Sequence, residues 1–429
     1  MVRWKQAALS ACALGLAVAL LPPGSAAARP TAEASPAGVD WFAEEAAGFA
    51  KERGISEAEA RERMAWQLVA PDLDELLQKD LGARYGAVWV DVRDGDRVKV
   101  GVTGGVDEPA RGVVKAAAQV VGLTGGYDLV SVKRSAARLA ADNDWLGEEV
   151  IRVNRDATVF LSAGLRPDLN AVQLGVPRKG GLTAAQEALV KAAQDRMGDG
   201  VVLAATSGGY RPFLGCDSPY CDAPLRGGVK INHPDTSCTS GFIAQSKVDS
   251  KKYVVTAGHC AMDNLGTWSS KNAALTVKAI GPVHRWIFDT YIGDMAIIRI
   301  SDTSIATGWD PRPWVLVTYS PQTNQNTTYH IAEDKMSLLG MRICTTGMAT
   351  RMTNCGHVTE LGLTANLGGL SMRNLGRTSN CSKPGDSGAP MFASHVAYGI
   401  LVGGVEDDCD TVYQGIRTAE RELNVNILH

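Results

Sequence analysis

Residues 383–390 read Lys-Pro-Gly-Asp-Ser-Gly-Ala-Pro, with glycines on both sides of an acidic residue and a serine. Glycine at position 385 permits a tight turn, so the backbone amides of Gly385 and Ser387 can converge on one point. Acyl transfer requires this arrangement, because a hydroxyl attacks the carbonyl carbon and amide N–H groups bind the resulting oxyanion. An ordinary surface turn uses the same residue types, so the hypothesis needs partner residues elsewhere in the chain.

A base for this serine is offered by residues 254–260, Val-Val-Thr-Ala-Gly-His-Cys, where an apolar strand ends in small residues and a histidine. A disulfide at Cys260 would anchor His259 in place. The alternative interpretation is a structural histidine without a chemical role.

An orienting carboxylate is offered by residues 293–300, Gly-Asp-Met-Ala-Ile-Ile-Arg-Ile. Asp294 opens an apolar strand, and a desolvated carboxylate needs a partner such as an imidazole N–H. Asp289 is a rival candidate, and a solvated aspartate on an edge strand is the alternative. We favour Asp294 because the continuous apolar run begins immediately after it.

The second half of the chain has the pattern of an all-β domain. Residues 206–429 are rich in Gly, Ser, Thr and Asn, and β-type runs at 253–256, 296–300 and 314–317 alternate with turn residues. Helical periodicity is nearly absent until residues 418–427. About 200 residues of this kind suit an antiparallel sandwich or paired barrels.

Together, these motifs resemble those of the chymotrypsin-like serine peptidases, in which histidine, aspartate and serine follow one another in the same chain order. The sequence from Cys381 to Ser387, the string at 256–260 and the segment 397–404 resemble the secreted bacterial streptogrisin and alpha-lytic branch of that family. The resemblance covers residues 206–429. It implies an all-β double antiparallel β-barrel (chymotrypsin-like) protease domain, preceded by an α+β pro-domain.

The resemblance also implies roles for individual residues. Ser387 would be the nucleophile, His259 the general base and Asp294 the orienting carboxylate. The amides of Gly385 and Ser387 would form the oxyanion hole. The segment Leu401, Val402 and Gly403 would pair with the substrate backbone as an added strand.

One position departs from the family pattern. Val402 stands where the family usually has a serine whose hydroxyl contacts the triad aspartate, and such a hydrogen bond contributes about 1 kcal/mol. The departure motivates an alternative function, a catalytically weak or silent chymotrypsin-fold binding module. An esterase or lipase is disfavoured because the nucleophile motif is not Gly-x-Ser-x-Gly.

The cysteines favour disulfides. Of nine cysteines, one lies at position 12 and the other eight lie between residues 216 and 409. An even number in an exported chain favours disulfides over a metal site, and neither Cys-x2-Cys nor His-Glu-x-x-His occurs. Spacing alone leaves the connectivity open, but the resemblance implies three bridges and leaves a fourth pair for a local bridge. The implied pairs are Cys238–Cys260, Cys344–Cys355 and Cys381–Cys409, and the remaining pair is Cys216–Cys221. We expect no metal and no other cofactor.

Residues 1–28 have the pattern of a secretory signal peptide. Arg3 and Lys5 precede an apolar run at 7–21, and small residues lead to Ala28. A lipoprotein site at Cys12 is the alternative, but most of the apolar run follows that cysteine. We therefore expect a secreted, extracellular protein.

Residues 29–205 contain no cysteine, and their pattern predicts an α+β region. The expected elements are helices at 41–70 and 73–81, a hairpin at 87–102, a helix at 109–121 and a strand at 129–132. The plan then recurs, with a hairpin around 154–156, a helix at 183–197 and a strand at 201–204. Two interpretations account for this recurrence. The region consists either of two weakly similar α+β units or of two unrelated pieces that share common local patterns.

In size and position, residues 29–205 resemble a pro-domain that assists folding and inhibits the enzyme. The expected organisation is a signal peptide at 1–28, a pro-domain at 29–205 and a protease domain at 206–429, with processing between about 200 and 226. The expected product is a serine endopeptidase made as a zymogen.

Bulk composition excludes other classes. The chain has 429 residues and a net charge of −3, from 43 Lys and Arg against 46 Asp and Glu, which excludes a strongly basic nucleic-acid binder. Beyond residue 28 no apolar run reaches the roughly 20 residues that span a bilayer. The expected partners are polypeptide substrates and the chain's own pro-domain, with no nucleic acid, no membrane after signal removal, and a monomeric state.

Overall fold

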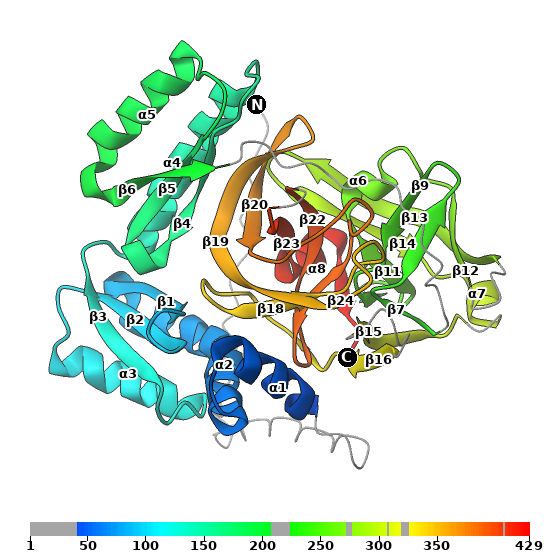
Figure 1. The fold of residues 1–429 in the computed structure, drawn as a ribbon, viewed down its shortest axis with the longest axis horizontal. Coiled ribbons are helices and arrows are strands. Elements are labelled where there is room, and N and C mark those ends of the chain that lie inside the picture. Colours follow the sequence, from blue (N-terminus) through cyan, green and yellow to red (C-terminus); the bar gives the residue numbers. More distant parts are fainter. Residues whose placement is uncertain (1–40, 207–223, 272–276, 307–308, 319–325, 406–407) are drawn as a thin grey trace, which may run out of the picture. The chain divides into compact units, whose positions relative to one another are not determined.

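The computed structural model describes residues 41–206, 224–271, 277–306, 309–318, 326–405 and 408–429 (Figure 1). Trp41–His429 forms one compact unit. The expected signal peptide, residues 207–223 of the expected processing region and both Cys216 and Cys221 lie outside the described residues. Within the described ranges, no helix is long and apolar enough to cross a membrane.

Residues 41–206 contain two units with the same order of elements. After a first helix, α1 (Trp41–Arg53), the order helix, strand, strand, helix, strand occurs twice. In each unit the first two strands are antiparallel and the third is parallel to the second. The first unit contains α2 (Glu57–Leu81), β1 (Tyr85–Asp91), β2 (Arg97–Thr103), α3 (Glu108–Val120) and β3 (Tyr127–Val132). The second contains α4 (Ala136–Asn154), β4 (Ser162–Arg166), β5 (Ala171–Pro177), α5 (Ala184–Met197) and β6 (Val201–Thr206).

Local sequence signals set most of these boundaries. Ser56 caps α2 by accepting the N–H of Glu59, and Thr183 with Gln186 forms a capping box at α5. The predicted break near residue 71 is wrong, because α2 runs through Pro71 and the chain instead turns at Gly54, whose φ is +66°.

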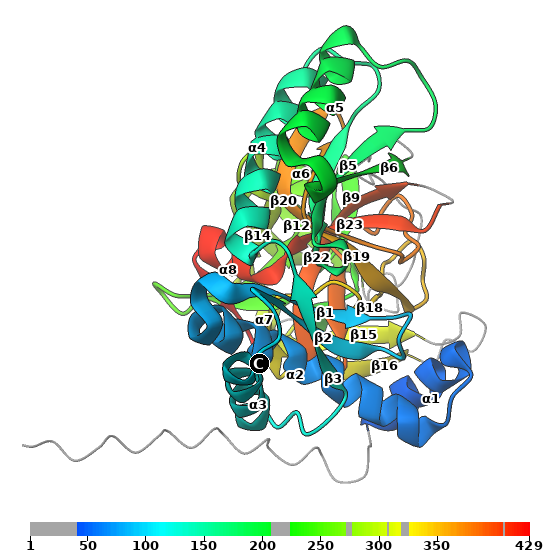
Figure 2. The same ribbon diagram turned by 90° about the vertical axis from the view of Figure 1, so that its left-hand side faces the viewer.

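The hairpin predicted around residues 154–156 is also wrong, because α4 extends to Asn154. Leu146, Val150 and Val153 lie on one face of α4 and are buried against β5 and α5, so helical packing determines this segment. The turn of the second hairpin lies at Asn170, which adopts the left-handed conformation. Helices α4 and α5 cover one face of the β4–β5–β6 sheet (Figures 1 and 2).

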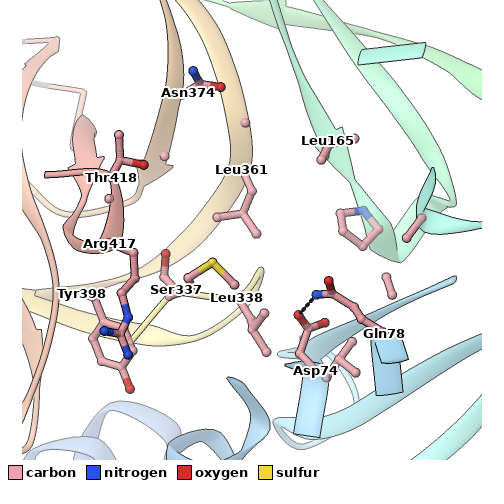
Figure 3. Close-up of a pocket in the computed structure, with 18 of the residues that line it drawn as sticks. Asp74, Gln78, Leu165, Ser337, Leu338, Leu361, Asn374, Tyr398, Arg417 and Thr418 are labelled. Atoms are coloured by element: carbon pink, nitrogen blue, oxygen red, sulfur yellow. Dashed lines mark hydrogen bonds between the residues drawn. The ribbon is translucent and has the colours of Figure 1, made fainter. Parts of the chain in front are cut away.

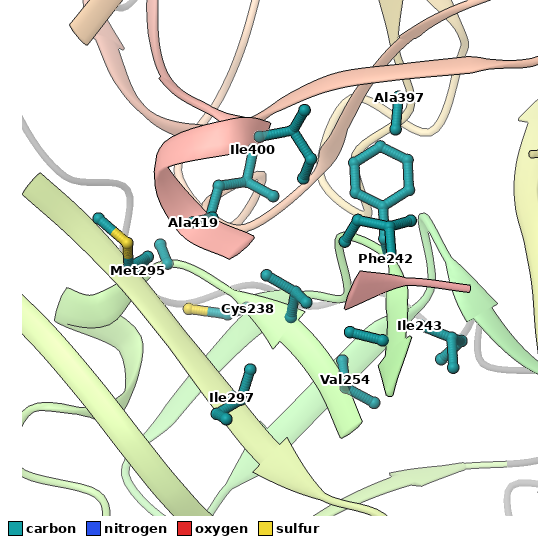
Figure 4. Close-up of a cluster of buried hydrophobic side chains, with 14 of the residues drawn as sticks. Cys238, Phe242, Ile243, Val254, Met295, Ile297, Ala397, Ile400 and Ala419 are labelled. Atoms are coloured by element: carbon teal, nitrogen blue, oxygen red, sulfur yellow. The ribbon is translucent and has the colours of Figure 1, made fainter. Parts of the chain in front are cut away.

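The first large sheet of the C-terminal region has the strand order β24-β10-β11-β14-β13-β12-β8-β9. This sheet contributes Ile243, Val254 and Ile297 to an apolar core that also includes Ile400 and Ala419 from the other half of this region (Figure 4). The strands are β8 (Lys230–His233), β9 (Thr236–Thr239), β10 (Ile243–Ser246), β11 (Lys252–Thr256), β12 (Thr267–Lys271), β13 (Val277–Asp289), β14 (Gly293–Arg299) and β24 (Val425–Ile427).

The second large sheet has the order β18-β21-β22-β23-β20-β19, and an additional β18–β19 pairing closes these six strands on themselves. Strand β17 also pairs with β22, and a separate small sheet has the order β16-β15-β7. The strands are β7 (Leu225–Gly227), β15 (Pro311–Thr318), β16 (Asn326–His330), β17 (Glu333–Asp334), β18 (Arg342–Thr345), β19 (Asn354–Leu367), β20 (Leu370–Thr378), β21 (Pro390–Ala393), β22 (Val396–Val405) and β23 (Asp410–Gly415).

The N-terminal region adds strands to this second sheet. β4 pairs antiparallel with β19, at Leu361 with Leu165 and Thr364 with Ala163, so β4, β5 and β6 continue the sheet beyond β19. The first unit contacts the same half of the molecule through a backbone hydrogen bond from the N–H of Val90 to the carbonyl of Leu339 at 2.8 Å.

The described part of the C-terminal region also contains three short helices, α6 (Gly258–Ala261), α7 (Asp302–Ala306) and α8 (Ile416–Leu423). The terminal helix predicted at 418–427 is therefore shorter than expected. Asn424 ends it in the left-handed conformation, and the last residues form β24, which pairs with β10.

Candidate active site

His259 and Asp294 are in direct contact. The Nδ1 of His259 lies 2.6 Å from the Oδ2 of Asp294, and the backbone N–H of His259 donates to Oδ1 at 2.9 Å. Both side chains are buried. Because a carboxylate only accepts hydrogen bonds, this contact places a proton on Nδ1, and in the neutral tautomer Nε2 is then the acceptor.

The local sequence explains this contact. β11 pairs with β14, so the histidine that follows β11 lies beside the aspartate that begins β14. The residue before His259 must be glycine, because a Cβ on Gly258 would lie 1.9 Å from the carbonyl oxygen of Ile287. Phe288 is the cross-strand partner of Asp294, and its ring makes a T-shaped contact with the imidazole of His259, with ring centroids 6.2 Å apart.

The Nε2 atom of His259 is buried, and within the described part of the chain it has no hydrogen-bond partner. An unpaired polar atom in a buried position is costly, because it has lost its water without gaining a replacement. This nitrogen is therefore available to take a proton from a neighbouring group.

Ser387 lies in a loop that depends on two glycines with positive φ, Gly385 at +105° and Gly388 at +87°. The residue between the first glycine and the serine, Asp386, anchors the loop. Its Oδ1 accepts the N–H of Ala349 at 2.8 Å and that of Thr350 at 3.1 Å, and its Oδ2 accepts the N–H of Lys383 at 2.9 Å. Burial raises the pKa of Asp386, and these three hydrogen bonds oppose the rise.

The serine loop lies against the histidine segment. The carbonyl of Ser387 accepts the N–H of Thr239 at 2.8 Å, and a Cβ on Gly388 would lie 2.0 Å from the Oγ1 of Thr256 and 3.1 Å from the N of Ala257. Thr256 and Ala257 directly precede Gly258 and His259 in the chain. The structure thus brings the segments of all three expected triad residues to one place between the two sheets.

Three disulfides join the pairs that the resemblance implies, Cys238–Cys260, Cys344–Cys355 and Cys381–Cys409. The first bridge holds the residue after His259, and the third holds the strand end before the serine loop. The sulfurs of Cys238 and Cys260 lie near His259, but both are bridged and neither can act as a thiolate ligand for a metal.

The expected substrate segment is only partly available. The N–H of Leu401 donates to the carbonyl of Ala389 at 2.9 Å, and the carbonyl of Leu401 accepts the N–H of Gly388 at 2.7 Å. The register of β22 on β23 shifts between Leu401 and Gly403, so Val402 lies at a β-bulge. Within this segment, Val402 is therefore the residue without a cross-strand partner in β23.

Two buried residues near the site carry no motif that sequence reasoning could use. Thr239 bonds the serine loop, and Gln414 on β23 accepts the backbone N–H of Asp294 through its Oε1 at 3.2 Å. Both are fully buried. The sequence offers no signal for either role, because each depends on which strands meet in the folded chain.

A cavity of about 320 Å³ lies elsewhere, between the first N-terminal unit and the second sheet. Figure 3 shows Asp74 and Gln78 on α2 facing Leu338 and Leu361 across this space, with a hydrogen bond of 2.6 Å between Asp74 and Gln78. None of His259, Asp294 and Ser387 lines it, so it is distinct from the site described above.

Two β-sheets that meet at a histidine–aspartate pair and a glycine-flanked serine define the class of chymotrypsin-like serine peptidases. The family model described as Trypsin matches residues 222–422. The chain is 30% identical over 177 residues to "Glutamyl endopeptidase 2" of Streptomyces griseus, a match that covers 41% of this chain and 84% of that protein. The chain belongs to the trypsin family and is a serine-type endopeptidase, so the predicted family and fold class are confirmed.

Other relatives extend the comparison. "Streptogrisin-C" of Streptomyces griseus is 27% identical over 364 residues, which cover 83% of this chain and 68% of that protein. A solved structure, titled "A glutamic acid specific serine protease utilizes a novel histidine triad in substrate binding", is 26% identical. It covers 48% of this chain and all of that chain, with a TM-score of 0.40.

Proposed function

We propose that this endopeptidase cleaves peptide bonds through a triad of Ser387, His259 and Asp294 and an acyl-enzyme intermediate. The observation that carries the proposal is the contact between His259 and Asp294, with Nδ1 2.6 Å from the carboxylate and Nε2 buried and unpaired within the described residues. This pattern fits a base that is held in the tautomer that accepts a proton at Nε2.

The proposed reaction has two halves. The Oγ of Ser387 attacks the substrate carbonyl carbon while its proton passes to Nε2 of His259, and the carbonyl oxygen becomes an oxyanion held by the amides of Gly385 and Ser387. The imidazolium then gives its proton to the leaving nitrogen as the C–N bond breaks. Water repeats the sequence on the acyl-enzyme and releases the acid, which regenerates Ser387. Asp294 stabilises the imidazolium in both halves.

For substrate binding, we propose that an extended peptide adds as a strand beside Val402 and Gly403. The β-bulge at Val402 supports this, because residue 402 has no cross-strand partner in β23. Side-chain specificity has no evident charged determinant. Residues 378–382 and 401–405 contain no acidic residue, no histidine and no basic residue, so neither a Lys or Arg preference nor glutamate recognition through histidine has support in these stretches.

We also propose that the protein is exported, and that residues 29–205 act as a pro-domain that assists folding, inhibits the protease and is then removed. The pairing of β4 with β19 and the 364-residue match to "Streptogrisin-C", which is longer than the protease domain alone, support this role. N-terminal sequencing of active secreted protein provides the test. Fully active material that still begins near residue 29 would contradict the removal of a pro-domain.

The triad is tested with Ser387→Ala. The variant should lose casein hydrolysis and labelling by a fluorophosphonate probe, because both need the serine hydroxyl. Ser382→Ala is the matched control, since Ser382 lies in the same loop and its hydroxyl bonds Thr411 at 2.7 Å. Cleavage and labelling by Ser387→Ala at the control's level would refute the assignment.

A further inference from the structure

Thr239 lies at the point where the two large sheets meet beside the serine loop. It is the last residue of β9, it is fully buried, and it follows Cys238, whose disulfide partner Cys260 follows His259. It is therefore adjacent in space both to the segment that carries the base and to the segment that carries the nucleophile.

Every polar group of Thr239 has a hydrogen bond. Its backbone N–H donates to the carbonyl of Ser387 at 2.8 Å, and its carbonyl accepts the hydroxyl of Thr256 at 2.9 Å. Its Oγ1 lies 2.9 Å from the carbonyl oxygen of Gly385 and accepts the N–H of Met348 at 3.2 Å. One threonine thus bonds the carbonyls of Gly385 and Ser387, the two residues whose amides are the expected oxyanion donors.

The direction of the hydroxyl proton follows from these partners. A hydroxyl has a single proton, and the N–H of Met348 already donates to Oγ1, so the hydroxyl proton is directed to the carbonyl of Gly385. The Met348 contact therefore orients the Thr239 hydroxyl as a donor to the loop.

The bond acts on the most adaptable residue of the loop. Gly385 has a φ of +105°, and glycine rotates between positive and negative φ more easily than any other residue. Asp386 is fixed by hydrogen bonds from Ala349 and Thr350, and Gly388 by its bond to Leu401. Among the described hydrogen bonds, the carbonyl of Gly385 accepts one from a side chain, and its donor is the hydroxyl of Thr239.

We propose that Thr239 is a positioning residue for the oxyanion hole. Its hydroxyl holds the peptide that follows Gly385, so that the amides of Gly385 and Ser387 stay directed at one point before substrate arrives. A preformed donor pair stabilises the charge that develops on the substrate oxygen without a rearrangement during the reaction. The proposal rests on the proposed triad mechanism and adds a residue that makes no contact with the substrate.

The experiment compares Thr239→Val, which removes the hydroxyl at nearly constant shape, with Thr239→Ser, which keeps it. Proteins are produced from the full chain, and rates are normalised by active-site titration. We expect Thr239→Val to lower kcat with KM little changed, by up to the roughly 10²-fold loss seen when one oxyanion donor is removed. Affinity for a peptide trifluoromethyl ketone, which mimics the tetrahedral oxyanion, should fall by the same factor. Thr239→Ser should restore both.

Ser270→Ala is the matched control, because Ser270 is fully buried and its hydroxyl also donates to a backbone carbonyl, that of Lys230 at 2.5 Å. It should lower thermal stability and leave kcat and inhibitor affinity unchanged. If Thr239→Val yields no folded protein, Thr239→Ala removes the same hydroxyl and takes its place in the comparison.

Three results would overturn the proposal. They are an unchanged kcat in Thr239→Val, a fall in kcat without a fall in inhibitor affinity, and an equal fall in the Ser270→Ala control. Failure of the triad itself would appear elsewhere, as activity retained by Ser387→Ala, so the two proposals fail in separate experiments.

Discussion

The side chain of Gln414 on β23 crosses to the other large sheet and accepts the backbone N–H of Asp294 at the start of β14, with 3.2 Å between Oε1 and N. The two residues are fully buried. Only glycine fits beside this contact, because a Cβ on Gly293 would lie 1.9 Å from the Oε1 of Gln414. The second sheet thus fixes the backbone of Asp294, whose carboxylate contacts His259. The side chain of Val402 has no hydroxyl that could do the same.

The first prediction follows from this contact. Gln414→Met keeps the length of the side chain and removes the acceptor, which leaves the N–H of Asp294 buried and unpaired. We expect kcat/KM to fall by about tenfold or more, since such a group costs about 1–3 kcal/mol. Steady-state kinetics on titrated enzyme measures the effect.

Gln245→Met provides the control for this variant. Gln245 donates to the carbonyl of Ser250 at 2.9 Å in an exposed part of β10, away from the active site. Its activity should equal that of the parent. Equal activities of parent, Gln414→Met and control would show that Asp294 does not depend on Gln414.

The outcome at particular residues shows how far sequence reasoning reaches. His259, Asp294 and Ser387 stand in local strings whose residue types fit the proposed chemistry, so the amino-acid sequence alone is enough to predict them as candidates. Thr239 and Gln414 cannot be selected in this way, because their roles come from backbone contacts made across two sheets. Their own neighbours in the sequence contain no trace of those contacts.

The fold shows the same division. Helices with strong end signals, such as α5 with its Thr183 capping box, lie where the pattern places them. The hairpin predicted at 154–156 failed because burial of Leu146 and Val150 against the neighbouring sheet extends α4. The short terminal strand β24 depends on β10, which is distant in sequence, and local periodicity does not reveal such a partner.

A second prediction concerns the junction between β4 and β19. A Cβ on Gly164 would lie 2.0 Å from the Oε1 of Glu360, and Glu360 is buried and paired with Arg377 at 2.8 Å. Gly164→Val should therefore displace β4 from β19. In full chain that carries Ser387→Ala, the amides of β19 should exchange with deuterium faster than in the parent.

Gly112→Val is the control for the junction variant, because a Cβ on Gly112 meets no atom within 4 Å. It should leave exchange in β19 unchanged. Protection of β19 that is identical in both valine variants would mean that β4 tolerates the bulk and that close approach at Gly164 is not required.

A third prediction concerns two disulfides that lie in different parts of the fold. Cys344–Cys355 joins paired positions on β18 and β19, whereas Cys238–Cys260 holds the residue next to His259. Replacing either pair by serine should lower the free energy of unfolding by about 2–4 kcal/mol. Only the variant at 238 and 260 should lose kcat per folded molecule, as measured with denaturant titration and kinetics. Equal kcat values in the two variants would contradict an anchoring role for the bridge at Cys260.

The last feature links α1 to the second sheet. The guanidinium of Arg53 on α1 lies 2.9 Å from the Nε2 of His357 on β19 and 2.8 Å from Asp96. Arginine can only donate, so His357 must be neutral and accept this hydrogen bond. Burial, and then the charge of Arg53, lower the pKa of His357 below its ordinary value of 6.5, while Glu52 and Asp96 oppose the shift and Arg342 adds to it.

A histidine whose pKa is lower in the folded protein binds fewer protons there than in the unfolded chain, so the stability it contributes is complete above about pH 6.5 and declines as the pH falls. We therefore predict that docking of α1 weakens between pH 7 and pH 5, because protonated His357 can no longer accept from Arg53 and its charge repels the guanidinium. Hydrogen exchange of α1 in Ser387→Ala protein, corrected for the intrinsic effect of pH, measures this loss of protection. His357→Gln keeps an acceptor without titrating and should abolish the pH dependence. Protection of α1 that falls equally in both proteins would place the pH-sensitive group elsewhere.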